Sequence, residues 1–68
     1  MNNDPITQAR LSMRVDRYMN EYTARNIEED NPSKANWYAV LQEVDRARVN
    51  NTLTPEMVDD VRIALHKL

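Results

Sequence analysis

Apolar residues recur at helical spacing in three segments of the chain, and each segment opens at a proline. Proline suits the first position of a helix because its missing N–H would have no partner there. The residue before each proline is a common helix cap, and proline holds that residue in the extended geometry that a cap needs. The three steps are Asp4-Pro5, Asn31-Pro32 and Thr54-Pro55. The sequence therefore predicts three helix starts, with Ser33 as a rival cap for the second.

The ends of these helices follow from charge and turn residues. The acidic run 28–30 would be unfavourable at a helix C-terminus but favourable before a helix N-terminus, so we place it in the first connection. Asn50-Asn51 can supply the left-handed cap that glycine usually provides. We expect helices at about residues 5–27, 33–49 and 55–67. Because no alternating strand pattern is present, the predicted fold class is all-α, a single compact three-helix domain over residues 1–68 with a long first helix.

The second and third helices each show one apolar stripe when their residues are placed at intervals of about 100°. In the second helix the stripe contains Trp37, Val40, Leu41, Val44 and Ala47. In the third helix it contains Met57, Val58, Val61, Ala64, Leu65 and Leu68. We expect both stripes to face the core. Tyr38 and Val49 lie off the first stripe and Ile63 lies opposite the second, so these side chains are candidates for contact with a partner.

The first helix carries two apolar strips rather than one. The first strip contains Leu11, Val15, Tyr18, Met19 and Tyr22. The second strip contains Ile6, Ala9, Met13, Ala24 and Ile27. A helix over residues 5–27 would span roughly 35 Å, whereas a compact globule of this chain length has a diameter of about 28 Å. Our hypothesis is that the first strip covers the core and that the second forms the interface of a helical homodimer.

Four arginines share a narrow arc of the first helix with Glu21, between the two apolar strips. They are Arg10, Arg14, Arg17 and Arg25. Three interpretations remain open. The stripe is a solvated face with one Arg17–Glu21 pair, or it meets an acidic face of the same fold or of a dimer mate, or it binds an external acidic protein or nucleic acid. The acidic candidates within the fold are Glu43, Asp45, Asp59 and Asp60.

The composition offers little for catalysis or metal binding. The chain has no cysteine, no glycine and one histidine, so it lacks a thiolate, a glycine-rich phosphate loop and the ligand set of a zinc site. No serine stands beside a recognisable base, and the acidic run 28–30 lacks the spacing of a calcium loop. We therefore expect no enzyme activity, no catalytic residue, no metal and no cofactor.

Charge and hydropathy point to a cytoplasmic protein. The formal net charge is −2, and no block of the sequence is basic enough to form an electrostatic footprint for nucleic acid. The longest apolar run, residues 37–41, is far shorter than the roughly 20 residues of a membrane span. No secretory signal pattern is visible at the N-terminus. Small acidic chains of this kind are typical of accessory proteins of bacteria and their phages, and we expect no contact with a membrane.

These features favour a protein–protein interaction module, a small adaptor, regulator or inhibitor that acts by binding the surface of a partner protein, and an acidic surface would suit the arginine stripe. The predicted partner-binding residues are Arg10, Met13, Arg14, Arg17, Tyr38 and Ile63. The alternative is a small helical nucleic-acid-binding transcriptional regulator, because a tight second connection outlines a helix-turn-helix. Nucleic acid is the less favoured partner, since the third helix begins with acidic residues. A structural subunit of a larger assembly is a second alternative.

Overall fold

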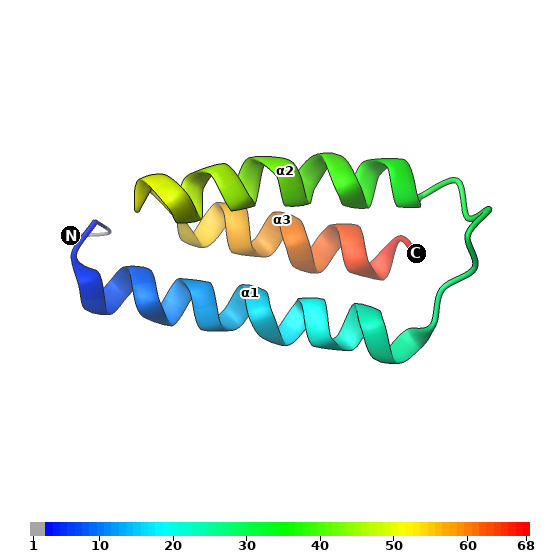
Figure 1. Cartoon of the computed structure of the whole chain (residues 1–68), viewed down its shortest axis with the longest axis horizontal. Helices are drawn as coiled ribbons and strands as arrows, with labels where there is room; N and C mark the ends of the chain where they lie inside the picture. The colour runs from blue at the N-terminus through cyan, green and yellow to red at the C-terminus, as the bar shows by residue number, and fades with distance from the viewer. Residues whose placement is uncertain (1–2) are drawn as a thin grey trace.

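The structure, a computed structural model, describes residues 3–68 of the chain. This part of the chain forms three α-helices and no strand: α1 Pro5–Arg25, α2 Lys34–Asn50 and α3 Pro55–His66. Figure 1 shows the helices side by side in an up-down-up order, with α3 parallel to α1 and antiparallel to α2. α3 packs against both other helices, whereas α1 and α2 approach each other less closely. The predicted all-helical three-helix domain is confirmed.

The first and third helices begin at their prolines, as predicted. Asp4 caps α1, because its Oδ1 accepts a hydrogen bond from the backbone N–H of Thr7 at 2.9 Å. Thr54 caps α3 in the same way, with its Oγ1 accepting from the backbone N–H of Met57 at 3.2 Å. Each cap satisfies one of the N–H groups that a helix start leaves without an internal partner.

The second helix begins later than its proline. Pro32 lies in a turn, and α2 starts at Lys34 with Ser33 at the cap position. The Oδ1 atom of Asn31 accepts a hydrogen bond from the backbone N–H of Ser33 at 2.8 Å. This local Asx turn uses Asn31 to close the loop rather than to cap the helix. The interpretation of Asn31-Pro32 as the helix start was therefore wrong, whereas the rival cap Ser33 and the expected bounds of about 33–49 agree with α2.

Asparagine ends two of the helices in a chain that has no glycine. Asn26 has a φ of 53° and Asn51 a φ of 57°, both in the left-handed region that asparagine tolerates better than most residues. Asn51 is the predicted cap of α2. Asn26 stops α1 at Arg25, before the predicted end at residue 27, and α3 ends at His66.

The core is built from both predicted stripes and from the first apolar strip of α1. Its buried members are Leu11, Val15, Trp37, Val44, Ala47, Leu53, Val58, Val61, Ala64 and Leu65. The remaining residues of the three predicted sets are half-buried around this cluster. The ring of Tyr22 stacks on Trp37 with the ring centroids 4.7 Å apart, a pairing that contributes about 0.5–1.5 kcal/mol beyond the area it buries.

The domain is a short rod with principal extents of 39 × 19 × 16 Å. The 21 residues of α1 span roughly 31 Å. The long axis of the rod therefore accommodates α1, which lies along α3 for most of its length (Figure 1). The prediction that α1 would extend beyond a compact monomer was wrong, because it assumed a spherical shape. The length of α1 requires no second chain.

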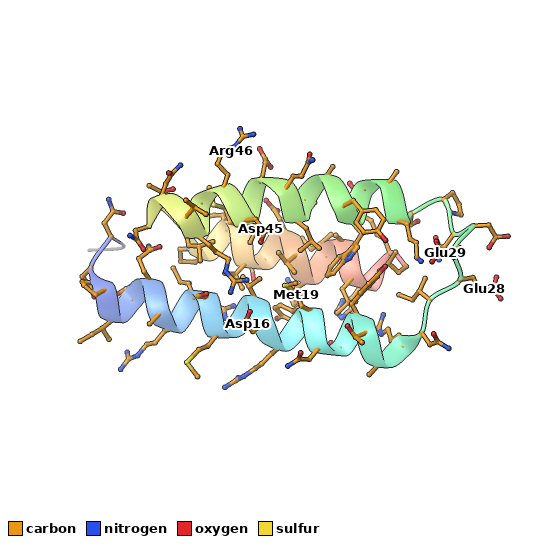
Figure 2. The ribbon with its side chains drawn as sticks, in the orientation of Figure 1. Asp16, Met19, Glu28, Glu29, Asp45 and Arg46 are labelled. Atoms are coloured by element: carbon orange, nitrogen blue, oxygen red, sulfur yellow. The ribbon has the colours of Figure 1, made fainter. Side chains whose placement is uncertain are left out.

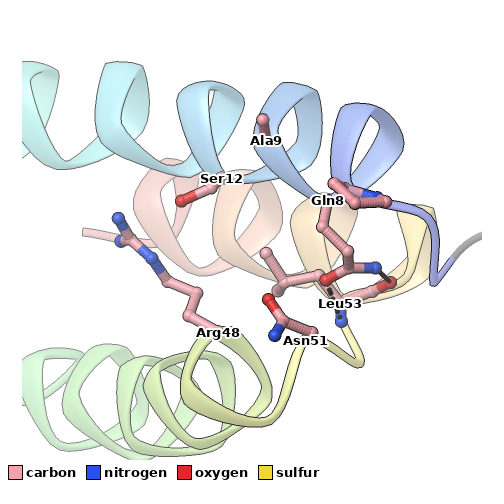
Figure 3. Close-up of a pocket in the computed structure, with 7 residues that line it drawn as sticks. Gln8, Ala9, Ser12, Arg48, Asn51 and Leu53 are labelled. Carbon is pink, nitrogen blue, oxygen red and sulfur yellow. Dashed lines mark hydrogen bonds between the residues drawn. The ribbon is translucent and has the colours of Figure 1, made fainter.

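A buried glutamine links α1 to the connection between α2 and α3. The side chain of Gln8 accepts a hydrogen bond from the backbone N–H of Leu53 through Oε1 and donates one to the Leu53 carbonyl through Nε2, both at 3.0 Å (Figure 3). The amide thereby pairs both backbone groups of a buried loop residue. Our predicted core did not include Gln8, because one polar residue beside an apolar strip carries no sequence signal for this role.

Two further side chains bind backbone carbonyls at the opposite end of the rod. The Nη1 atom of Arg25 donates to the carbonyl of Leu65 at 3.1 Å. The Nδ2 atom of Asn31 donates to the carbonyl of Leu68 at 3.1 Å. Both carbonyls lie at the end of α3, where helical hydrogen bonding runs out, and the Leu65 carbonyl also accepts a hydrogen bond from the backbone N–H of Leu68 at 3.2 Å. The C-terminal end of α3 is thus tied to the end of α1 and to the first connection.

We predict that replacement of Gln8 by alanine destabilises the fold strongly. The substitution leaves the buried N–H and C=O of Leu53 without partners, at a cost of about 1–3 kcal/mol for each group. A total loss near 2 kcal/mol or more would lower the melting temperature by roughly 10 °C in a domain of this size. Thermal unfolding followed by circular dichroism measures the effect. The exposed Asn20→Ala variant of the same helix is the control, and equal melting temperatures for the two variants would contradict the assigned role.

We also predict that Asp4 contributes stability that disappears in acid. The hydrogen bonds from the backbone N–H and the hydroxyl of Thr7 lower the pKa of Asp4 below its ordinary value of 3.8. A lowered folded-state pKa means that the contribution is complete above pH 3.8 and is lost as the pH falls through the lowered pKa. Asp4→Asn keeps a capping side chain but does not titrate. Urea unfolding between pH 5 and pH 2 should show a shallower loss of stability for Asp4→Asn than for the wild type, and parallel curves would contradict this.

Candidate interaction surface

The arginine stripe of α1 lies beside α3. The Nη2 atom of Arg14 is 3.9 Å from Oδ1 of Asp59 on α3. The same carboxylate oxygen is 3.8 Å from Nε of Arg62, one turn further along α3. Asp59 was one of the four acidic residues considered as partners for the stripe within the fold. Of these four acidic residues, the structure places Asp59 beside the stripe, and Asp59 contacts Arg14.

The same two helices also carry exposed apolar side chains. Ile6 is 66% exposed and Met13 is 59% exposed on α1, and Ile63 is 43% exposed on α3. Spacings of three or four residues place Ile6, Met13 and the arginines on neighbouring rows of α1, and Ile63 follows Asp59 by one turn. We call this surface the α1–α3 arginine face. It consists of Ile6, Arg10, Met13, Arg14, Arg17, Asp59, Arg62 and Ile63.

The α1–α3 arginine face is positive in a protein that is negative overall. Four arginines against one aspartate give it a formal charge of +3, whereas the whole chain carries −2. Arg10 and Arg17 are exposed and form no ion pair with any residue in the range 3–68. The two contacts of Asp59 are long and solvent-exposed, so they contribute little to stability. The face thus retains donors and charge for an external group.

Arg25 does not belong to this face. Its Nη2 atom pairs with Oε1 of Glu21 at 3.0 Å, and its Nη1 atom binds the Leu65 carbonyl. The solvated-face interpretation had paired Glu21 with Arg17 instead, and that pairing was wrong. An acid four residues before a base is the more favourable order on a helix, which explains why Glu21 pairs with the later arginine. Arg25 is therefore structural, and the stripe divides into three surface arginines and one that holds α3.

The residues predicted for a dimer interface do not form one continuous strip. Ile6, Ala9, Met13 and Ala24 are exposed on α1, but Ile27 is half-buried and lies beyond the end of the helix. The exposed polar residues Asp16, Arg17 and Asn20 stand between Met13 and Ala24. Ala9 lines a hollow on the side of α1 that faces α2. Ile6 and Met13 thus form the apolar part of the face that remains.

Tyr38 lies apart from the other predicted partner-binding residues. Its hydroxyl oxygen is 3.4 Å from that of Tyr22, so the side chain sits over the side where α2 faces α1. The Tyr22 hydroxyl is the main cause that raises the pKa of Tyr38. Tyr38 is 53% exposed and lies on the side where α1 and α2 meet, not on the α1–α3 arginine face.

A hollow of about 230 Å³ lies between the start of α1 and the end of α2 (Figure 3). Its lining residues are Pro5, Gln8, Ala9, Ser12, Arg48, Asn51 and Leu53. The main polar groups in it already have partners, because Gln8 binds Leu53 and Arg48 pairs with Asp16 at 2.9 Å. Ligand pockets usually measure about 300–1,000 Å³. This hollow is therefore smaller than a usual small-molecule site, and we consider the α1–α3 arginine face the stronger candidate for binding.

The remaining acids and bases of the surface are distributed elsewhere. Figure 2 shows Glu28 and Glu29 on the loop at the far end of the rod and Arg46 directed away from α1. Within residues 3–68, no three side chains of the metal-binding types gather into a possible metal site. None of the helices in that range has the length and apolar character needed to cross a membrane.

Comparison with protein-family models, with curated proteins and with solved structures gave no significant match to this chain.

We predict that the two free arginines of the face contribute almost nothing to folding. Arg10 and Arg17 are exposed and form no ion pair in the described residues, and substitutions at such positions change stability by within about 0.5 kcal/mol. The double variant Arg10→Glu/Arg17→Glu should therefore unfold in urea within roughly 1 kcal/mol of the wild type. A loss of several kcal/mol would show instead that the stripe is an internal ion-pair element.

Proposed function

We propose that the protein is a non-catalytic protein-binding module that presents its α1–α3 arginine face to an acidic surface of a partner protein. One observation carries the proposal. Arg10 and Arg17 stand exposed, without ion pairs in residues 3–68, on both sides of the exposed Met13. Unpaired cations around an apolar side chain are the arrangement that complementary interfaces use.

The chemistry of the face fits a protein better than a nucleic acid. Methionine and arginine are enriched at protein interfaces, and arginine is frequent among the residues that dominate binding. A phosphate backbone would gain little from Ile6, Met13 or Ile63, and Asp59 beside Arg14 would weaken its attraction to the face. Three or four phosphate contacts give only weak, salt-sensitive binding.

The nucleic-acid alternative was suggested by a possible helix-turn-helix formed by the second and third helices. In a helix-turn-helix the two helices cross at about 90–120°. Here α2 and α3 run antiparallel along each other, as Figure 1 shows. The acidic first turn of α3, which begins with Glu56, is therefore not presented as a recognition helix would be.

A second copy of the chain complements the face less well than an acidic protein does. A two-fold copy packed through Met13 with its α1 antiparallel would place Arg10 of one copy near Arg17 of the other. Such like-charge contacts oppose association. The homodimer therefore stays as the competing occupant of the same surface, and oligomeric state is a test of which occupant is present. A structural subunit of an assembly would use the face in the same way as an adaptor.

We predict that charge reversal on the face weakens binding to the protein partner. The baits are the wild type, Arg10→Glu/Arg17→Glu and the matched control Arg46→Glu, whose arginine is exposed on the outer side of α2. Captured proteins that survive nuclease treatment are purified and titrated against each bait. The double variant should weaken the affinity by at least about tenfold, and the wild-type affinity should fall as salt rises. Arg46→Glu should bind like the wild type.

Three other results would each overturn the proposal. Capture that disappears with nuclease would identify nucleic acid as the ligand. Light scattering could show that the wild type has the mass of two chains and that Met13→Asp has the mass of one. That result would identify self-association through the face. Equal binding by the double variant and the wild type would show that the face is only solvated.

A further inference from the structure

The two free arginines of the α1–α3 arginine face are separated by two helical turns. Arg10 and Arg17 are seven positions apart on α1, which corresponds to a rise of roughly 10.5 Å. Arg14 lies between them, but Asp59 partly neutralises it. The face therefore offers two strong anchoring points for carboxylates, at opposite ends of a short row, rather than an even band of positive charge.

The apolar residues of the face fall between and beside these two points. Met13 lies between Arg10 and Arg17 in sequence, and Ile63 follows Asp59 on the neighbouring helix. Met13 adapts its flexible side chain to a range of apolar surfaces. A ligand that uses both arginines must therefore also cover an apolar surface midway between its two acidic groups.

We propose that the face binds an acidic amphipathic α-helix of the partner protein. In that helix two carboxylates seven positions apart pair with Arg10 and Arg17, and an apolar residue between them packs on Met13. The inference rests on the proposed protein-binding function and adds the shape of the ligand to it. Arginine suits this role because its planar group can bind a carboxylate through two parallel hydrogen bonds.

Helical geometry matches the arginine spacing better than extended geometry does. Residues seven positions apart lie on the same side of a helix at a rise of roughly 10.5 Å, equal to that between Arg10 and Arg17. Residues on one side of an extended strand lie about 6.8 Å or about 13.6 Å apart. An extended acidic peptide would therefore meet one arginine and miss the other by roughly 3 Å, whereas a helix packed along α1 meets both.

Asp59 makes the match selective. It stands beside the centre of the row and pairs with Arg14 and Arg62 at distances that leave it half exposed. A third carboxylate in the middle of the ligand helix would meet Asp59 as well as Arg14, so it would gain less than a carboxylate at either end. The face thus favours acids at the two ends and an apolar residue at the centre over a uniformly acidic segment.

The test is a displayed library of alanine-based helical peptides of about 18 residues, roughly five turns, with one face randomised. Peptides are selected for binding to the wild-type protein. Those that also bind the Arg10→Glu/Arg17→Glu variant are removed. Enriched peptides should carry Asp or Glu at two positions seven apart, with an apolar residue three or four positions after the first. Moving one acid by two positions in a synthetic peptide should weaken binding at least about tenfold.

A charge exchange provides the second part of the test. A peptide with Lys in place of its second acid should bind poorly to the wild type and recover binding to Arg17→Glu or Arg10→Glu, according to the direction of the helix. Asp59→Asn should newly accept peptides with a central acid. Arg46→Glu should give the wild-type result throughout.

The outcomes separate this inference from the proposed function. Peptides that need Arg10 and Arg17 but lack the acid pair would overturn the helical ligand and leave the protein-binding face intact. The absence of any peptide dependent on these arginines would overturn the helical ligand, while the purified-partner titration decides the protein-binding function independently. Recovery of the acid pair at a spacing other than seven would also overturn the inference.

Discussion

The packing of α3 against both α1 and α2 is the constraint on which the rest of the structure depends. α3 is the shortest helix, with 12 residues, yet Val58, Val61 and Leu65 on it are completely buried. α1 and α2 approach each other less closely than either approaches α3, so α3 makes the main contacts with both. Only the α3 part of the α1–α3 arginine face, which contains Asp59, Arg62 and Ile63, depends on this packing. The row of arginines lies on α1 alone, and its spacing is set by that helix.

Hydrogen bonds from side chains to the backbone secure the packing of α3 at both ends of the rod. Gln8 binds Leu53, two positions before the first residue of α3, and Arg25 and Asn31 bind carbonyls at the end of α3. A domain of this size has a small net stability, so three such contacts are a substantial part of it. The polar residues of α1 thus differ in their roles. Arg25 is committed to structure, whereas Arg10 and Arg17 remain available for a partner.

Features set by nearby residues in the sequence, such as the apolar stripes, could be predicted. Contacts between residues on different helices or loops could not. Periodicity identified the buried stripes, including Trp37, because one face of a helix is decided within a few turns of sequence. Gln8 escaped prediction because its partner is in a distant loop. The candidate surface was predicted only in part. Its residues on α1 were named, but the choice of Asp59 among four acids, and the separation of Tyr38 from the rest, require the arrangement of all three helices.

The chain contains an acidic segment of its own, and the geometry of the face explains why that segment is a poor ligand for it. Residues 28–30 are three consecutive acids on a loop, and three consecutive residues extend over at most about 7 Å between their ends. They can engage Arg10 or Arg17 but not both, and they bring no apolar residue to Met13. A requirement for two carboxylates about 10.5 Å apart on a helix therefore discriminates against head-to-tail association of identical chains, which would otherwise build open filaments. The overall negative charge acts in the same direction by making copies of the protein repel one another.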